Sequence, residues 1–305
     1  MDPIISVREL SKRYDDSVAV DDISFDVHRG EVFTLLGPNG AGKTTTVEII
    51  EGYRSRSAGY VLVFGRDPAT TSDRWRRRIG VMLQTSGHFD EMTTREVLEH
   101  FGDIYGVARG AVDSVIDDLG LGELESSLCR RLSGGQQRRL DLALAVVGAP
   151  ELLFLDEPTT GFDPEARRLA WELIAKLQAS GTTICLTTHF MDEAERLSNR
   201  IAVMRGGKLV ALSTPAELSE GFSEQLVTIR FRSLPSTLWL SPIVFETRTR
   251  VQSDGDYTII ETAEPTKVLS DLINWAAGQE LPELSVRRRS LEDAYLELVQ
   301  DSTQE

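Results

Sequence analysis

A glycine-rich segment that ends in a lysine and two threonines has the residue types and spacing to bind phosphate, because it fits the pattern GxxxxGK[ST]. In this pattern glycines let backbone N–H groups approach phosphate oxygens, the lysine reaches the outer phosphates, and the next hydroxyl can bind Mg²⁺. The alternative is a glycine-rich turn with a surface lysine, but the apolar run before the segment and the helical pattern after it favour phosphate binding. The matching residues are Gly37, Pro38, Asn39, Gly40, Ala41, Gly42, Lys43, Thr44 and Thr45.

Two adjacent carboxylates, Asp156 and Glu157, follow the apolar run 152–155. This pattern predicts that they lie at the carboxyl end of a buried strand, where open α/β sheets bind their ligands. An isolated acidic pair is more often a helix cap or part of a solvated surface. Here the spacing from the phosphate-binding segment, and from a Ser-Gly-Gly-Gln segment between the two, favours a shared site.

That intervening segment is Leu132-Ser133-Gly134-Gly135-Gln136, and at this place in the order it resembles the signature motif of the ATP-binding cassette (ABC) family. The resemblance covers about residues 4–218 and is greatest to type-2 ABC exporter ATPases of the drug-resistance kind. It implies a P-loop NTPase core with a mostly parallel sheet, an antiparallel β subdomain and an inserted helical subdomain. It also implies ATP and Mg²⁺ as ligands, hydrolysis to ADP and phosphate, and a role in export.

The resemblance assigns roles to four residues around the γ-phosphate. Asp156 corresponds to the carboxylate that supports Mg²⁺, and Glu157 to the one that polarises the attacking water. His189 resembles the switch histidine that contacts the γ-phosphate, although an isolated histidine is usually structural. Gln84 resembles the glutamine that senses Mg²⁺ and the attacking water, but it lacks the proline that commonly precedes this glutamine.

Three further assignments complete the nucleotide site. Tyr14 resembles the aromatic residue that stacks on adenine, with simple packing as an equal alternative. Asp163 follows Phe162 in a segment that resembles the D-loop, where leucine is more usual than phenylalanine. In this family the signature residues of one subunit close over ATP held by the other, which implies a homodimer with two composite sites. The signature residues concerned are Ser133, Gly134, Gly135 and Gln136.

Composition limits the other classes of function. The net charge of −15 over 305 residues argues against a chain that wraps nucleic acid. We expect the arginines between residues 74 and 78, and the trio 287–289, to be solvated surface. No apolar run approaches the roughly 18 residues of a membrane span. The resemblance therefore implies a separate integral membrane permease, with this chain bound at the cytoplasmic face of the membrane.

The hydrophobic patterns predict two structural regions. Short apolar runs at 32–36, 152–155, 183–187 and 201–204 are typical of parallel strands covered on both faces. Residues 86–147 are predicted to be mainly helical. Thr93 and Glu96 are expected to form one capping box together, and Ser133 is expected to cap a second helix.

We predict a nucleotide-binding domain over residues 1–220 and a small α+β appendage over 221–305 that serves assembly, dimerisation or regulation. The stretch from Gln84 through residue 105 is the expected permease-docking surface. An ATP-dependent sensor or regulatory module that does not drive transport is the alternative to an export motor.

Overall fold

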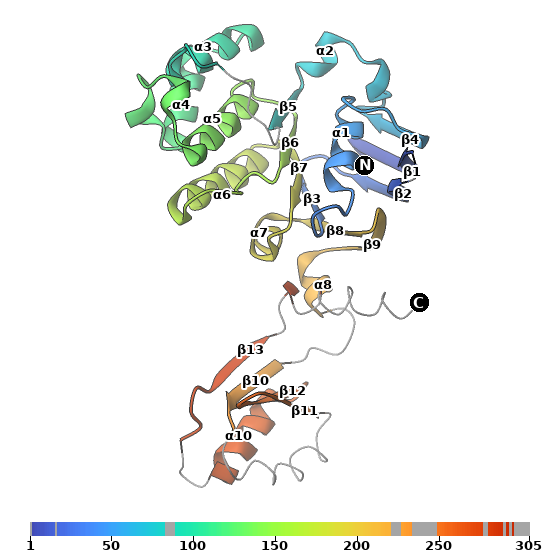
Figure 1. Cartoon of the computed structure of the whole chain (residues 1–305), viewed down its shortest axis with the longest axis vertical. Coiled ribbons are helices and arrows are strands. Elements are labelled where there is room, and N and C mark those ends of the chain that lie inside the picture. Colours follow the sequence, from blue (N-terminus) through green and yellow to red (C-terminus); the bar gives the residue numbers. More distant parts are fainter. Residues whose placement is uncertain are drawn as a thin grey trace. The chain divides into compact units, whose positions relative to one another are not determined.

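The computed structural model describes residues 2–15, 17–82, 89–220, 227–233, 249–276, 280–288, 291–292 and 295. The chain folds as two compact units, Met1–Thr214 and Pro215–Glu305 (Figure 1). Each unit has its own sheet and its own hydrophobic core.

A six-stranded sheet forms the centre of the first unit, in the order β5-β6-β7-β3-β8-β9. Neighbouring strands are parallel except for β9, which pairs antiparallel with β8. Helices lie on both faces of this sheet (Figure 1), which is why β3, β6 and β7 are buried along their whole length. The predicted α/β core is confirmed. The strands are β3 (Val32–Leu36), β5 (Ile79–Met82), β6 (Leu152–Asp156), β7 (Thr183–Thr188), β8 (Arg200–Arg205) and β9 (Lys208–Ser213).

Two hydrophobic clusters hold the helices against the sheet. Phe33 and Phe154 point into one cluster, beside the phosphate-binding helix, and Leu153 and Leu186 point into the other, beside the inserted helices. The alternation of sides along β6 follows from the two-residue period of a strand. The helices of the core are α1 (Lys43–Ile50), α2 (Asp73–Arg76), α6 (Pro164–Ala179) and α7 (Met191–Leu197).

A separate three-stranded antiparallel sheet has the order β2-β1-β4. Its strands are β1 (Ile5–Tyr14), β2 (Ser17–Val27) and β4 (Ala58–Val63). Ile5, Val7 and Leu10 of β1 are buried, so one face of this sheet packs on the core. The antiparallel subdomain implied by the resemblance is therefore present.

The inserted region consists of α3 (Thr94–Tyr105), α4 (Arg109–Asp118) and α5 (Gly134–Val146), with short 3₁₀ turns between α4 and α5. Both predicted caps are confirmed: Thr93 with Glu96 begins α3, and Ser133 with Gln136 begins α5 as capping boxes.

Helical spacing in the sequence predicts one apolar face for α3, made of Val97, Leu98, Phe101, Ile104 and Tyr105, and this prediction is wrong at one position. Val97 and Leu98 are buried, but Ile104 is 46% exposed, since it lies on the side of the helix away from the subdomain core.

The second unit contains a four-stranded antiparallel sheet in the order β11-β12-β10-β13, confirming an α+β appendage. Val268 and Leu272 of α10 pack with Phe231 and Ile260 of the sheet. The spacing of Ser290 and Asp293 in the sequence predicts a capping box for a last helix, but both residues lie outside the described residues. The elements are α8 (Pro215–Glu220), β10 (Val227–Arg232), β11 (Thr249–Asp254), β12 (Tyr257–Thr262), α10 (Pro265–Ala276) and β13 (Ser285–Arg288).

None of the helices in the described ranges is both long enough and apolar enough to cross a bilayer.

Gly80 gives a test of how closely the inserted region packs on the core. A Cβ atom at Gly80 would lie 2.1 Å from the carbonyl oxygen of Ala145 in α5. We expect Gly80→Ala to lower the free energy of unfolding by about 1–3 kcal/mol, the usual cost of overpacking, as measured by urea denaturation. Gly110→Ala is the matched control: it has no neighbour within 4 Å of the added carbon and lies in α4, so it should stabilise slightly. Equal effects of the two variants would contradict the close approach.

Candidate active site

The phosphate-binding segment connects β3 to α1 through a tight loop. Gly40 and Gly42 have φ angles of +81° and +99°, in the left-handed region that favours glycine. A Cβ atom at Gly37 would lie 2.3 Å from the carbonyl oxygen of Met204 in β8. The loop therefore passes against the sheet and turns into the N-terminus of α1, where free N–H groups face an anion. Of its residues, Pro38, Asn39 and Gly40 are exposed, Gly37, Ala41 and Lys43 are buried, and Gly42, Thr44 and Thr45 are half-buried.

Lys43 is held at the edge of this loop. Its Nζ donates to the carbonyl oxygens of Gly37 (2.8 Å) and Pro38 (3.1 Å), and lies 3.7 Å from Oε1 of Glu157. The side chain is only 4% exposed, and burial lowers the pKa of its ammonium, while the charges of Glu157 and Asp156 oppose that change. The structure thus places one buried cation between the loop and the acidic pair.

Asp156, the last residue of β6, is 6% exposed. Its Oδ1 accepts hydrogen bonds from the hydroxyls of Thr44 (3.3 Å) and Thr187. Burial raises the pKa of this carboxyl, whereas the two threonine hydrogen bonds oppose the rise. A carboxylate beside a threonine hydroxyl is the hard-oxygen donor set that Mg²⁺ prefers. Among the described residues no cluster of three or more His, Cys, Asp or Glu could hold a metal, so any further ligands would come from phosphates and water.

Glu157 lies at the centre of the arrangement. Its Oε1 is 3.2 Å from Nδ1 of His189, which follows β7 directly, as well as 3.7 Å from Lys43. Its backbone has φ +50°, and its N–H donates to both the carbonyl and the hydroxyl oxygen of Thr187, each at 3.1 Å. These bonds hold a residue without glycine's freedom in the left-handed region. The carboxylate is therefore aimed between a lysine and a histidine.

The other predicted residues are more scattered. Ser133 and Gly134 are exposed at the start of α5. Asp163 caps α6, since its Oδ1 accepts from the Ala166 N–H at 2.8 Å. The Tyr14 ring is half-buried, with Lys12 Nζ 4.9 Å from its centroid. Gln84 lies outside the described residues.

Arg138 is a site residue that the sequence analysis missed. Its guanidinium donates to the carbonyl oxygens of Asp156 (2.7 Å) and Glu157 (3.2 Å), and burial lowers its pKa. Since Arg138 lies in α5, which Ser133 begins, it joins the signature helix to the acidic strand end. The only signal in the sequence was a basic residue soon after the signature motif.

Glu193 of α7 was also missed, and it is fully buried. It accepts hydrogen bonds from the Thr159 hydroxyl (2.8 Å) and from Nε1 of Trp171 in α6 (3.1 Å). Thr159 lies two residues after Glu157, and α7 begins two residues after His189. Glu193 thus connects the segments that carry the two side chains.

The sequence profile of the family described as ABC transporter matches residues 20–160. The chain is 37% identical to the Nod factor export ATP-binding protein I of Ralstonia nicotianae, over 97% of this chain and 94% of that protein. It is 35% identical to the daunorubicin/doxorubicin resistance ATP-binding protein of Streptomyces peucetius, over 96% and 92%. A solved ATP-binding subunit of an ABC transporter superposes with a TM-score of 0.66 at 28% identity, covering 72% of this chain and 93% of that one.

Glu193 allows a test by mutation and pH. Glu193→Ala leaves the buried Thr159 hydroxyl without an acceptor, which should lower the free energy of unfolding by about 1–3 kcal/mol. The half-buried Trp171 N–H loses the same acceptor and should add a smaller cost. Glu193→Gln keeps an acceptor in place and should cost less.

The pH dependence of the same variants follows from the carboxyl group. Burial raises the pKa of Glu193 above its ordinary value of 4.5. The resulting stability is complete below that value and is lost as the pH rises through the raised pKa. Urea denaturation at several pH values should therefore show Glu193→Gln gaining stability relative to the native chain as the pH rises. A constant difference would contradict the buried, proton-retaining environment.

Proposed function

Because the chain belongs to the ABC transporter family, we propose that it hydrolyses ATP to ADP and phosphate and drives export through a separate integral membrane permease. One observation carries the hydrolytic part. The Glu157 carboxylate lies between Lys43 and His189, beside the pair formed by Asp156 and Thr44. The site therefore combines a cation that can bind phosphate, two oxygen donors that can bind a metal ion, and a carboxylate that can orient water.

The phosphates of ATP would bind at the N-terminus of α1 and against Lys43. Lys43 would exchange its contacts with loop carbonyls for the β- and γ-phosphates. Thr44 and Asp156 would hold Mg²⁺, which when bound neutralises charge that develops on the phosphates. The hydrogen bond from the Thr44 hydroxyl to Asp156 Oδ1 supports this assignment.

Glu157 would orient a water molecule toward the γ-phosphate, and His189 would hold that geometry. The left-handed backbone of Glu157 and its two bonds to Thr187 support this role, since they fix the direction of the carboxylate before substrate arrives. The proposed role of Gln84 in sensing Mg²⁺ and the attacking water rests on the family resemblance alone. The proposed stacking of Tyr14 on adenine rests on it as well.

We propose a homodimer as the active unit. Ser133 and Gly134 begin α5 at the surface, and their capping box leaves other N–H groups of the first turn available to an anion. The Arg138 contacts link this helix to Asp156 and Glu157 of the same subunit. A γ-phosphate held by a partner would therefore bind at the N-terminus of α5, about one turn away from the Arg138 contacts with the acidic pair.

Export is the direction that the relatives favour, because the names of both curated relatives describe export or drug resistance. The chain would then act at the cytoplasmic face of the membrane, bound through its permease. The appendage, with its own sheet and core, would serve assembly, dimerisation or regulation. A sensor without a transport role is the alternative, and a permease-stimulated ATPase rate would exclude it.

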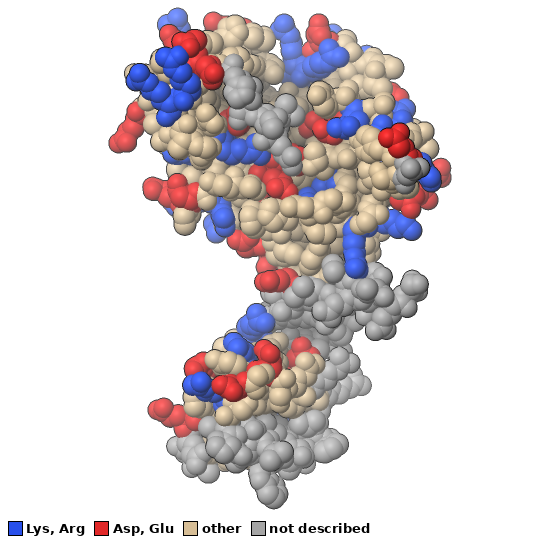
Figure 2. All heavy atoms as spheres, viewed as in Figure 1, with Lys and Arg blue, Asp and Glu red and all other residues tan. Residues whose placement is uncertain are grey.

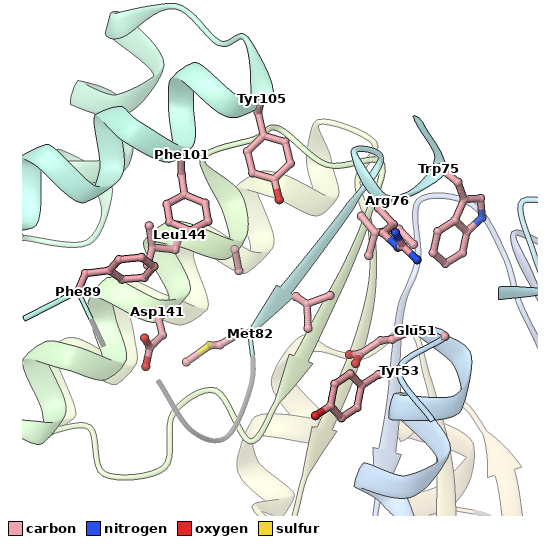
Figure 3. A pocket seen from close by; sticks show the side chains of 14 residues that line it. Glu51, Tyr53, Trp75, Arg76, Met82, Phe89, Phe101, Tyr105, Asp141 and Leu144 are labelled. Carbon is pink, nitrogen blue, oxygen red and sulfur yellow. The ribbon is translucent and has the colours of Figure 1, made fainter. Parts of the chain in front are cut away.

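A cavity of about 600 Å³ supports a docking site for the permease. Figure 3 shows Glu51 and Tyr53, beyond the end of α1, facing Phe101 and Tyr105 of α3 across it. The lining is mainly apolar and aromatic, which suits an inserted segment of a partner. Tyr53 is 75% exposed although it is a large aromatic residue.

Two charged residues of the expected docking surface have partners within the inserted region instead. Glu91 pairs with Arg130, and Arg95 contacts Glu125 and Asp113, both at 2.8 Å. Charge reversal at either residue would disturb the subdomain itself. Tyr53 is therefore a better probe of docking.

The hydrolytic assignment predicts the behaviour of Glu157→Gln. This variant should bind ATP normally but hydrolyse it about 100-fold more slowly or worse, because it loses only the water-orienting charge. Phosphate release measures the rate, and size-exclusion chromatography with ATP and Mg²⁺ should show a trapped dimer.

Lys43→Ala should instead weaken ATP binding in a titration. Hydrolysis at the native rate by Glu157→Gln would remove Glu157 from its role.

The docking proposal predicts that Tyr53→Ala weakens the complex with the permease. Truncating an exposed interface aromatic should cost at least about 1 kcal/mol, or about fivefold in affinity, measured with purified permease in detergent. Basal ATPase activity should stay unchanged, while stimulation by the permease falls. Tyr60→Ala is the control, since Tyr60 is also exposed but lies on β4 outside the cavity. Equal loss in both variants would place the docking surface elsewhere.

A further inference from the structure

A second cavity, of about 620 Å³, lies beside α2. It shares Trp75 with the docking cavity, so the two open next to each other on the first unit. In the space-filling view, Lys and Arg side chains gather over the region of α2 (Figure 2). The residues that line it are Arg66, Ser72, Arg74, Trp75, Arg78 and Glu151.

One wall of this cavity contains an ion pair, Arg78 with Glu151, whose charges cancel. Arg78 donates to both carboxylate oxygens of Glu151, at 2.6 and 2.7 Å, and its guanidinium lies 3.7 Å from the centre of the Phe64 ring. The pairing with Arg78 lowers the pKa of Glu151, so the carboxylate stays charged. Trp75 is buried and donates its ring N–H to the carbonyl oxygen of Val63 at 3.1 Å.

The other wall carries cations that this carboxylate does not neutralise. Within the described parts of the chain, the side chains of Arg66 and Arg74 make no hydrogen bond or ion pair. Ser72 precedes α2, and its hydroxyl makes no capping hydrogen bond to that helix. Arg66 precedes the turn at 67–71 in the chain, and Ser72 and Arg74 follow it. Of the arginines expected to be solvated surface, Arg76 pairs with Asp73 and Arg78 with Glu151. Arg74 instead lines the cavity together with Arg66.

We propose that this cavity binds a phosphate group on an anionic molecule. Guanidinium groups present planar sets of donors that match phosphate oxygens, and they are weakly hydrated compared with ammonium groups. Three arginines face one glutamate here, in a chain whose net charge is −15, so the local positive charge is not a general property of the surface. A phosphate group, whether a diester or free, has at least two unesterified oxygens, and each can accept more than one hydrogen bond from the donors of Arg66, Ser72 and Arg74.

Two sources could supply that phosphate: the headgroup of an anionic lipid, or a free phosphate compound. The position beside the docking cavity favours the lipid, since a bound permease would bring this face to the membrane. That preference for the source rests on the proposed function. The phosphate site itself does not.

The experiment uses the full chain with an excess of a non-hydrolysable ATP analogue and Mg²⁺ in every sample, so that the phosphate loop is filled up to the γ-phosphate position. Sedimentation with phosphatidylglycerol vesicles, compared with phosphatidylcholine vesicles, tests the lipid source. Titration with inorganic phosphate, followed by tryptophan fluorescence because Trp75 lines the cavity, tests the free source. The double variant Arg66→Gln/Arg74→Gln should weaken the observed binding at least tenfold.

The control double variant is Arg77→Gln/Arg109→Gln. It removes the same charge from two exposed arginines that do not line the cavity, and it should keep native binding. Binding of phosphatidylglycerol vesicles in competition with inorganic phosphate supports a headgroup site, and binding of inorganic phosphate alone supports a free phosphate compound. Equal loss in both double variants, or no binding of either probe by the native chain, overturns the proposal. Thermal unfolding and ATPase activity of each variant show separately whether the fold and the hydrolytic function persist.

Discussion

The structure of the first unit depends on the buried carboxylate of Asp156. Its Oδ1 accepts from Thr44 at the start of α1 and from Thr187 in the neighbouring strand, while its carbonyl oxygen accepts from Arg138 of the inserted helix. Four segments far apart in the chain thus meet at one residue. A buried charge that lost these donors would be costly, so the fold and the site are stabilised by the same hydrogen bonds.

Much of this arrangement could be predicted because its signals are local. Each element is indicated by residues within a few positions of it: the apolar run before Asp156, the glycines before Lys43 and the cap at Ser133. Parallel strands end at a common edge, so the order of the motifs was sufficient to place the lysine and the two carboxylates together.

The residues that were missed are those whose role depends on packing between distant segments. Arg138 reaches carbonyl oxygens 18 and 19 positions away, and Glu193 accepts from a hydroxyl 34 positions away. Neither contact has a periodic signature. The arginine-lined cavity could not be predicted for the same reason. Arg66 comes near Arg74 and Arg78 only because the chain turns between β4 and α2. Ile104 shows the opposite error, in which helical spacing extended an apolar face beyond the part that packs.

Glu157 sits at a backbone angle that suits glycine, φ +50°. Such conformations store about 1–3 kcal/mol, so the fold carries a standing cost at the position where it holds its central carboxylate. Selection for stability alone would favour glycine there, whereas selection for turnover would favour glutamate. Glutamate at this position therefore lowers the conformational stability of the protein but provides its catalytic activity. Chains evolved or engineered for heat resistance would meet that conflict at this position before they met it in the core.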